Sequence, residues 1–397
     1  MARGFDDAFG IYVHFPLCRA RCGYCEFSVV VREQFPHEAY ARRVADEIAH
    51  RAKDYAGLRL DSLYFGGGTP SLWPAREVAR VVDAARRAAA GGAEGMEVTL
   101  EANPGTVDRA LLGDLRAAGV NRLSIGVQSL DDGTLRGLTR RHDARTGRAA
   151  LEHARAAGFD NVSCDLIFGL GGQSVEAHLR DARELLALGP EHISTYALTL
   201  SRGSALRQAG GETVDDDTSA EMMQRGRELL EQAGYEHYEV SNFARPGHRS
   251  RHNSLVWSGR PYAGVGAAAH GMVLARHVDG DAGWSQTRIA NAPFDRYMEG
   301  ELRDGPPGHV STARVFAVDE AQAEQEWVML GLRLREGVVR ERFAARFGRD
   351  VLDDETRRRA AEDLHDAGML VIDDERVAPT PRGIWFADEM ALRLGHR

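Results

Sequence analysis

The sequence contains few cysteines and no long apolar run. Only four cysteines occur in 397 residues, which excludes a small secreted domain held together by disulfides. The first residues, MARGFDDAFG, lack the apolar stretch of a signal peptide. No run of about 18 apolar residues is available for a membrane span. We therefore expect a cytoplasmic protein and leave peripheral membrane association open.

An excess of positive charge is also missing. The formal net charge is −9, whereas a general nucleic-acid binder needs a basic surface. We therefore expect no nucleic-acid partner. The hydrophobic fraction of 43% over this length is sufficient for one large domain and a smaller one.

Three of the four cysteines lie close together. Cys18, Cys22 and Cys25 have the spacing C-x3-C-x2-C. Three thiolates hold three irons of a [4Fe–4S] cluster, and the fourth iron is then open to a small molecule. A zinc site, the weaker alternative with His14 nearby, would need four Cys or His ligands. Cys164 stands alone, and we expect a small buried strand residue there, with a fourth ligand role as the minor alternative.

Short β-like runs alternate with helical stretches over the first 234 residues. Stretches rich in Ala and Arg, such as 75–90, carry apolar residues at steps of three and four, which is typical of amphipathic helices. This alternation predicts an α/β fold with a parallel sheet of βα units, whose chemistry lies at the C-terminal strand ends. The expected strands are Ile11–Phe15, Ser62–Phe65, Glu97–Glu101, Arg122–Val127, Val162–Phe168 and His192–Leu200.

The pattern changes after Gly234. We expect a βα core over 1–234, a Gly- and His-rich segment over 235–308 and a helical domain over 309–397. The sequence GELRDGPPG at the end of the second part reads as a linker. In the third part, helices followed by a short hairpin and a final helix favour a winged-helix-like domain.

Polar and flexible residues follow the expected strands. The glycine run in Gly66–Pro70 lets backbone approach a ligand and offers its N–H and C=O groups. Glu101, Gln128, Arg140 and Asp165 add two carboxylates, an amide and a guanidinium, which suit a zwitterionic ligand with ribose hydroxyls. Each of these residues also has a purely structural interpretation. Glu101 could cap the following turn, Arg140 could form a surface ion pair, and Asp165 could be a buried group with all its hydrogen bonds satisfied. Their positions on successive strand ends favour one shared site.

The segments HFPLCRARCGYC, YFGGGTP, LEANP, IGVQS and DLIFGL, in this order, resemble the radical S-adenosylmethionine (SAM) superfamily. More narrowly, they resemble the group that contains the oxygen-independent coproporphyrinogen III oxidases and the HemW heme chaperones. The resemblance covers essentially the whole chain and implies a partial (β/α)6, TIM-like barrel with a C-terminal domain. It implies a [4Fe–4S] cluster on Cys18, Cys22 and Cys25, and SAM contacts from Tyr12, Tyr24, Gly67, Gly68, Thr69, Glu101, Gln128, Arg140 and Asp165.

Two features favour the heme-chaperone branch. The oxidases typically carry C-x3-C-x2-C-x-C after a substantial N-terminal extension, whereas here Phe27 occupies the fourth cysteine's position and seventeen residues precede Cys18. The resemblance thus implies a protein that binds heme and passes it to acceptor proteins, respiratory ones among them, without coproporphyrinogen III oxidase activity. Three alternative functions stay open. The protein could be that oxidase or another radical enzyme that acts by hydrogen abstraction or methyl transfer. The third alternative is a cluster that serves as a redox or structural switch. A homodimer also stays open.

A heme ligand is implied by a second motif. HemW-like proteins resemble one another around HNxxYW, which reads HNSLVW from His252 here, with Val256 in place of the tyrosine. Imidazole is a natural axial ligand of heme iron, and Trp257 offers a surface for a porphyrin face. His252 is therefore the expected heme ligand, and an ordinary hydrogen-bonded loop histidine is the alternative. The other candidates are His248 and His270 as ligands and Arg245, Arg249 and Arg251 as partners of the propionates.

One further departure from the family pattern lies after the fifth strand. The turn reads GLGGQ, with Gly171 where the family has proline. Glycine has more conformational freedom than proline, so this turn should be looser.

Overall fold

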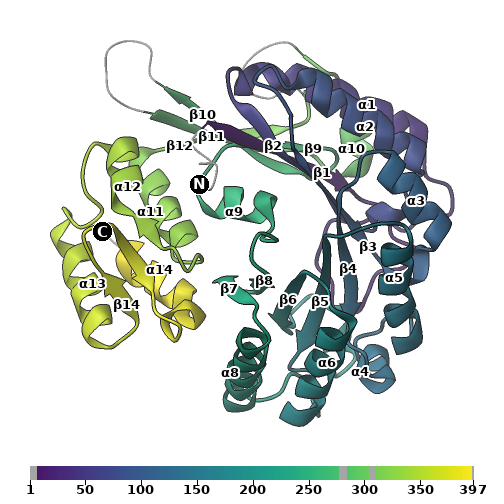
Figure 1. The fold of residues 1–397 in the computed structure, drawn as a ribbon. Helices are drawn as coiled ribbons and strands as arrows, with labels where there is room; N and C mark the ends of the chain where they lie inside the picture. Colours follow the sequence, from purple (N-terminus) through teal and green to yellow (C-terminus); the bar gives the residue numbers. More distant parts are fainter. Residues whose placement is uncertain (1–6, 277–283, 304–309, 396–397) are drawn as a thin grey trace.

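The computed structural model of the chain describes residues 7–276, 284–303 and 310–395. Within these ranges, twelve strands form one mixed sheet in the order β12-β11-β10-β9-β1-β2-β3-β4-β5-β6-β8-β7 (Figure 1). Strands β1 to β6 follow one another in space as they do in the sequence, and each pairs in parallel with the next. Their bounds are β1 (Ala8–Phe15), β2 (Arg59–Gly67), β3 (Glu97–Ala102), β4 (Arg122–Gln128), β5 (Val162–Phe168) and β6 (His192–Ala197).

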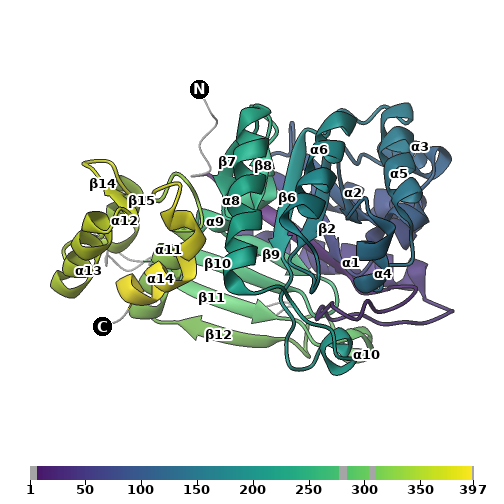
Figure 2. The same ribbon diagram turned by 90° about the horizontal axis from the view of Figure 1, so that it is seen from below.

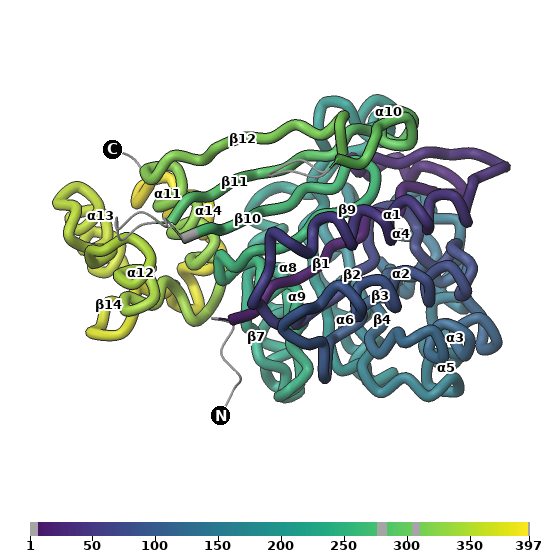
Figure 3. Tube along the Cα trace, turned by 90° about the horizontal axis from the view of Figure 1, so that it is seen from above, coloured from purple at the N-terminus to yellow at the C-terminus, as the bar shows by residue number. Residues whose placement is uncertain are grey.

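Helices cover the outer face of this parallel sheet, where Figure 3 shows α1, α2, α3 and α5 side by side. Helix α2 illustrates why, because Val78, Val81, Val82 and Ala85 are buried at helical spacing on one face. The helices of this region are α1 (His37–Arg51), α2 (Ala75–Ala88), α3 (Arg109–Ala117), α4 (Asp132–Gly137), α5 (Ala144–Ala156), α6 (Val175–Leu188), α7 (Ala205–Gln208) and α8 (Asp216–Gln232).

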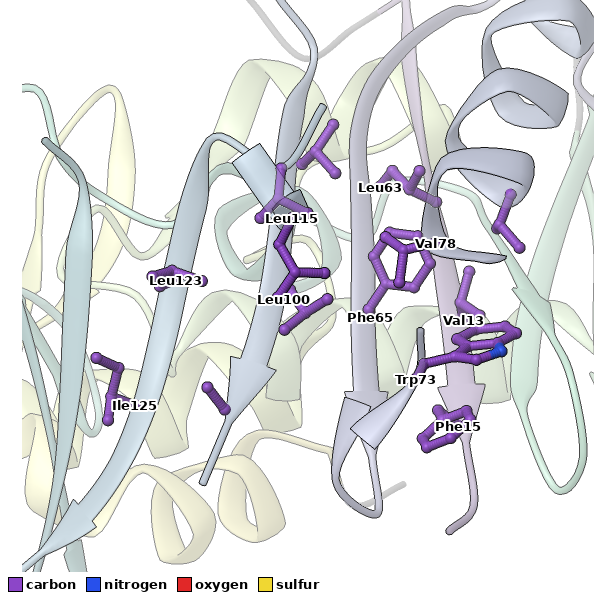
Figure 4. Packing of buried hydrophobic residues seen from close by; sticks show 14 of the residues in the cluster. Val13, Phe15, Leu63, Phe65, Trp73, Val78, Leu100, Leu115, Leu123 and Ile125 are labelled. Carbon is purple, nitrogen blue, oxygen red and sulfur yellow. The ribbon is translucent and has the colours of Figure 1, made fainter. Parts of the chain in front are cut away.

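The two faces of the sheet differ in chemistry. Outward-pointing side chains such as Phe15, Phe65 and Leu100 pack with Trp73 and Val78 in the main hydrophobic core (Figure 4). Successive residues of a strand point to opposite faces. The alternate positions of these strands therefore point inward, and there they carry tyrosine, histidine, serine and carboxylate side chains.

The predicted parallel sheet is confirmed, although several strand ends differ from those expected. Strand β1 begins at Ala8 rather than Ile11, and β2 spans Arg59–Gly67 rather than Ser62–Phe65. The sixth strand was expected to extend to Leu200 but ends at Ala197. Beyond it, the amide of Leu198 donates to the carbonyl of Phe168, and the Leu198 side chain packs with Leu138 and Ile167. The apolar residues that suggested a longer strand thus build a wall beside the strand ends.

Residues 235–318 complete both edges of the same sheet, so position 234 does not separate two structural units. Strand β8 pairs with β6, and β9 pairs in parallel with β1 before β10, β11 and β12 continue the sheet. The linker predicted at 300–308 lies largely outside the described residues. The elements are β7 (Glu236–Glu239), β8 (Asn242–Ala244), α9 (Arg251–Trp257), β9 (Tyr262–Val265), β10 (His270–Arg276), β11 (Trp284–Ala290), α10 (Phe294–Glu299) and β12 (Arg314–Val318).

A buried polar network fixes this added edge to α1. Glu47 is fully buried and forms an ion pair with Arg51 at 2.9 Å. Its carboxylate also accepts hydrogen bonds from the Gly266 amide at 2.9 Å, the Tyr297 hydroxyl at 2.8 Å and the Asn291 amide at 2.8 Å. A buried charge is tolerated only when it is fully partnered, so this network specifies how the later segment docks.

The C-terminal residues form a separate small core with the winged-helix order of elements. Strand β15 pairs with both β13 and β14, and the hydrophobic cluster around Phe343 and Met390 lies within this part. Figure 2 shows it beside the far end of β10 to β12. Its elements are α11 (Glu320–Gly331), β13 (Val338–Val339), α12 (Arg340–Phe347), α13 (Glu355–Asp366), β14 (Leu370–Ile372), β15 (Arg376–Pro379) and α14 (Ala387–Gly395). Among the described helices, none has the length and apolar character to cross a membrane.

Candidate functional site

A cavity of about 360 Å³ opens at the C-terminal ends of the parallel strands. Its volume falls within the range typical of small-molecule sites. The loop after β1, the turn after β2 and the ends of β3 to β6 all contribute to its walls. Of the residues expected to form a site, those that line it are Cys18, Cys22, Tyr24, Cys25, Gly67, Gly68, Thr69, Glu101, Gln128, Arg140 and Asp165.

The three cysteines are half-buried, free and on one wall of the cavity. Cys18 Sγ lies 3.4 Å from the Thr69 hydroxyl, and Cys22 Sγ lies 3.6 Å from the Arg140 guanidinium. Burial raises the pKa of the Cys18 and Cys25 thiols. No three His, Cys, Asp or Glu side chains of the described ranges are placed to hold one metal ion. Such convergence is what zinc requires, whereas a cubane presents separate irons to separate thiolates.

The glycine turn lies against the cysteine loop. Gly68 N donates to the carbonyl of Phe15 at 2.8 Å, and Thr69 N donates to that of Leu17 at 2.9 Å. A Cβ on Gly68 would stand 2.7 Å from the Leu17 carbonyl oxygen. At Gly67, φ is +107° and a Cβ would meet the His14 ring at 2.5 Å. Glycine is therefore required at both positions, for space at Gly68 and for conformation and space at Gly67.

Two carboxyl groups, Glu101 and Asp165, line the floor of the cavity. Burial raises the pKa of Glu101 to about 7, although hydrogen bonds from the Tyr64 hydroxyl at 2.9 Å and the Gly67 amide at 3.1 Å act in the opposite direction. Burial also raises the pKa of Asp165, which accepts from Ser124 at 3.4 Å. Both side chains are acceptors suited to hydroxyl donors or a cation.

Gln128 and Arg140 carry polar atoms that lack protein partners. Gln128 ends β4 at a φ of 66°, a strained conformation for a residue other than glycine. Its Oε1 and the Nε of Arg140 are buried and have no hydrogen-bond partner among the described residues. Arg140 is positioned by its bond to the Gly126 carbonyl at 2.9 Å. Unsatisfied buried groups facing one cavity are a feature of a binding site.

Tyr12 is the one expected SAM contact that the cavity lining does not include. Its role as a SAM contact stays a prediction. Its hydroxyl is 3.1 Å from His14 Nδ1. The structure also adds residues that were not singled out from the sequence: Asn103, Ser124, Gly126, Ile167, Tyr196 and Leu198. Ser124 and Gly126 alternate with Gln128 along β4, a signal that would have identified them.

His252 lies below this cavity, in the floor of the barrel. It is 6% exposed, its Nδ1 is 2.9 Å from the Ser62 hydroxyl, and its ring stacks on Tyr64 at 5.1 Å. Burial lowers the pKa of His252 to about 3. The backbone amides of Arg251 and His252 donate to the Glu97 carboxylate at the start of α9. The fold therefore uses His252 as a packed, neutral core residue and does not present it to a heme.

The arginines near His252 likewise have structural partners. Arg251 pairs with Asp61, Arg249 pairs with Glu236 at 2.9 Å, and Arg245 lies over the Tyr235 ring at 5.0 Å. Their role as partners of heme propionates stays a prediction. Of the alternative histidines, His248 is half-buried, whereas His270 is exposed at the start of β10.

The turn with Gly171 is held in place. The Gly171 amide donates to the Glu212 carbonyl at 2.8 Å, and a Cβ would stand 2.9 Å from that oxygen. Proline has no amide hydrogen and could not make this bond. This bond restrains the turn, and the looser turn expected from glycine stays a prediction.

Comparison with known proteins agrees with this geometry. Residues 12–185 match the model of the radical SAM superfamily, and residues 318–386 match that of the HemN C-terminal domain. The heme chaperone HemW of Bacillus subtilis is 31% identical over 384 residues, 96% of this chain and 97% of that protein. The chain belongs to the HemW family of radical SAM proteins. Cys164, buried within β5, is a core residue of this HemW-family chain, as expected.

Two further comparisons extend the result. The mitochondrial radical S-adenosyl methionine domain-containing protein 1 of Bos taurus is 35% identical, over 97% of this chain and 86% of the relative. The structure of Escherichia coli coproporphyrinogen III oxidase HemN superposes with a TM-score of 0.78 at 22% identity, covering 99% and 91% of the two chains. This second likeness shows the fold, which is the expected partial barrel with its C-terminal domain.

Membership in the radical SAM superfamily gives this HemW-family chain a [4Fe–4S] cluster and SAM as cofactors. The cavity fits both groups. It offers three thiols on one wall and, opposite them, buried acceptors and unpartnered polar atoms. The glycine turn leaves room for a ligand against backbone. When bound, the cluster supplies one-electron chemistry; the protein positions its ligand and encloses it.

Proposed function

We propose that the protein is a heme chaperone that binds heme and transfers it to acceptor proteins. The observation that carries this proposal is the similarity to HemW proteins named as heme chaperones in several bacteria, at 31–35% identity over 66–97% of this chain. Phe27, exposed where the oxidases have a fourth cysteine, supports the same assignment. The long match makes the C-terminal domain part of the shared architecture.

We further propose which residues bind the cofactors. Cys18, Cys22 and Cys25 are the cluster ligands. The side chains and backbone opposite them bind SAM, because they combine glycine backbone, acidic acceptors and an amide on one cavity. This set comprises Tyr24, Gly67, Gly68, Thr69, Glu101, Gln128, Arg140 and Asp165.

A heme titration of the anaerobically reconstituted protein tests the proposed function. The Soret band is followed as heme is added to protein whose iron and sulfide contents match one cluster per chain. Saturable binding near one heme per chain, followed by transfer to an apo-heme protein, is the expected result. Binding that does not saturate, or heme that no acceptor can withdraw, would reject the carrier function.

A radical enzyme acting on a porphyrinogen is the second candidate, favoured by the resemblance of the whole fold to that of HemN. Anaerobic incubation with coproporphyrinogen III, a reductant and SAM should then yield a decarboxylated product. Absence of this product, together with saturable heme binding, would leave the chaperone function alone. SAM cleavage without a porphyrin product would instead point to another radical substrate.

Location and partners follow from the proposed function. We propose a cytoplasmic protein, supported by four free cysteines, although some relatives are mitochondrial. The acceptors are proposed to include respiratory heme proteins, which would bring the chaperone to a membrane surface without a spanning segment. Vesicle flotation and sedimentation with and without heme test membrane association and homodimer formation.

A further inference from the structure

Three aromatic rings are stacked in the floor of the barrel, beneath the cofactor cavity. Tyr12 of β1 is directly paired with Tyr64 of β2. Both point inward, because the adjacent residues Val13 and Leu63 point to the outer core (Figure 4). The centre of the His252 ring lies 5.1 Å from that of Tyr64 and 6.3 Å from that of Tyr12, and both pairs of rings are stacked. The stack therefore joins α9 to the first two strands of the sheet.

The Tyr64 hydroxyl connects this stack to the cavity. It donates to Glu101 Oε1 at 2.9 Å, and the Gly67 amide donates to Oε2 at 3.1 Å. A carboxylate oxygen can accept more than one hydrogen bond, so both oxygens keep capacity for a ligand in the cavity that Glu101 lines. Tyr64 is not among the described residues that line this cavity. Any effect of Tyr64 on a ligand there passes through Glu101.

The first glycine of the turn leaves room for this connection. A Cβ on Gly66 would stand 3.0 Å from Glu101 Oε1. It would also stand 3.0 Å from atoms of the Tyr12 and Tyr64 rings. All three neighbours belong to the connection, so a side chain at this position would displace it. The absence of a side chain at Gly66 is thus what allows the Tyr64 hydroxyl to reach the carboxylate.

His252 supports the Tyr64 ring from the other side. Its Nδ1 is 2.9 Å from the hydroxyl of Ser62, which lies two residues before Tyr64 on the same face of β2. A Cβ on Gly10 would stand 3.1 Å from that nitrogen, so the His252 ring fits closely against the backbone of β1. The bonds from the start of α9 to Glu97 fix the backbone of His252 as well. Its ring therefore has a fixed position against Tyr64.

The same connection affects the charge of Glu101. Burial raises the pKa of Glu101 to about 7, and the charge of Asp165 acts in the same direction, whereas the hydrogen bond from Tyr64 lowers this pKa. A hydrogen bond to the charged form of a group favours that form. The Tyr64 hydroxyl therefore helps to keep Glu101 as an accepting carboxylate near neutral pH. The titratable and charged groups around Glu101 are Tyr12 of β1, Tyr64 of β2, Asp165 of β5, Tyr196 of β6 and Arg140 after α4.

We propose that Tyr64 is a positioning residue of the SAM site, whose hydroxyl holds the Glu101 carboxylate toward the cavity while the His252 ring holds Tyr64 in place. This inference rests on the proposed SAM-binding role of Glu101 and is independent of heme. It gives the histidine of the HNSLVW segment an effect on the cofactor site, although His252 is not among the described residues that line the cavity.

Calorimetric SAM titration of the reconstituted protein from about pH 6 to about pH 9 tests the proposal. In wild type, SAM affinity should rise through about pH 7 as Glu101 ionises. Tyr64→Phe keeps the ring but removes the hydroxyl. Loss of a hydrogen bond to a charged group should move the midpoint of this rise upward by about one pH unit. SAM affinity should then be about fivefold below wild type at pH 7 and approach it at about pH 9.

Two further substitutions provide the control and the test of His252. The buried hydroxyl of Tyr55 donates to the Met272 carbonyl at 3.3 Å. Tyr55→Phe therefore removes a buried hydroxyl that does not contact Glu101, and it should leave the pH profile unchanged. His252→Ala leaves the Tyr64 ring without support and should move the midpoint upward by less than Tyr64→Phe does. His252→Phe places an aromatic ring there again and should restore the wild-type midpoint.

The outcomes separate this connection from the SAM site itself. If Tyr64→Phe has the wild-type midpoint, the proposal is refuted, whether or not the affinity falls uniformly. Glu101→Gln should abolish the pH dependence, and Tyr64→Phe added to it should lower SAM affinity by less than about twofold. A larger loss in the double variant would show that Tyr64 acts by another route and would also refute the proposal. If Glu101→Gln keeps the wild-type affinity and pH dependence, the SAM-binding role of Glu101 is itself wrong. Iron content equal to wild type shows that each variant retains its cluster.

Discussion

Substitution of Gly68 by alanine tests how the glycine turn supports the cysteine loop. The added Cβ would lie 2.7 Å from the carbonyl oxygen of Leu17 and 2.8 Å from that of Phe15. Both atoms are backbone, so no side chain can rotate away. The turn is also held against them by the amides of Gly68 and Thr69, at 2.8 and 2.9 Å. The backbone that leads into Cys18 must therefore move.

The size of the effect follows from this contact. Overpacking of a well-packed region costs about 1–3 kcal/mol, and here the displaced backbone also positions a thiol and one wall of the cavity. We expect Gly68→Ala to lower the unfolding free energy by about 2 kcal/mol. We also expect a loss of SAM affinity of about tenfold, which corresponds to about 1.4 kcal/mol. Iron and sulfide analysis, calorimetric SAM titration and denaturant unfolding measure these three quantities.

Gly113 provides the matched control. It lies within α3, and a Cβ there would meet no atom within 4 Å. Gly113→Ala should therefore stabilise the helix by about 0.5–1 kcal/mol and leave the cluster and SAM binding unchanged. If Gly68→Ala has the same iron content and SAM affinity as Gly113→Ala, the glycine turn does not support the cysteine loop as proposed.

Three other predictions test the pH dependence of SAM binding, the retention of the cluster and the stability that a buried ion pair provides. Burial raises the pKa of Glu101 to about 7, so its accepting carboxylate form gains population as the pH rises through that value. SAM affinity should rise over the same range, and Glu101→Gln should flatten the profile measured by calorimetry. Cys22→Ser should abolish the cluster, which iron analysis measures. His252→Ala should retain the iron but lower the unfolding free energy by about 2 kcal/mol, which denaturant unfolding measures. Removal of one partner from a buried ion pair costs about 3–5 kcal/mol, so Glu47→Ala should destabilise strongly. Glu176→Ala, which breaks exposed pairs, should cost less than about 1 kcal/mol in the same unfolding assay.

The parallel core could be predicted because its signals are local. Strand β5, with the continuous run VSCDLIF, was placed with correct ends, since a strand buried on both faces needs apolar residues throughout. The turn with Gly67 and Gly68 was recognised for the same reason. In contrast, β9 contains Gly264 and pairs with β1 across more than 250 residues of chain. No periodicity within one segment reveals such a pairing, so the added sheet edges were not foreseen.

The cavity residues divide along similar lines. Glu101 and Gln128 were found because they lie at or next to strand ends, where side chains of neighbouring parallel strands meet, whereas Asp165 lies within β5. A motif gives the order of residues along a strand but not the depth of each below the cavity, so it did not show that Tyr12 lies outside the cavity lining. Tyr196 carries no motif and was found only when β6 was seen to form the wall.

His252 shows most clearly how a motif and a site can differ. The segment from His252 to Trp257 is one short helix, α9, whose two ends contact different parts of the molecule. At the start of the helix, His252 lies against Ser62 and Tyr64 in the barrel floor. At its end, Trp257 lies beside the C-terminal domain, and the Arg333 guanidinium is 5.2 Å from the centre of the Trp257 ring. A change at His252 therefore reaches heme only through stability and the position of α9, which would leave the Soret spectrum of bound heme intact. Unfolding free energy and Soret spectrum, measured together on His252→Ala, thus show whether this residue supports the fold or holds the heme.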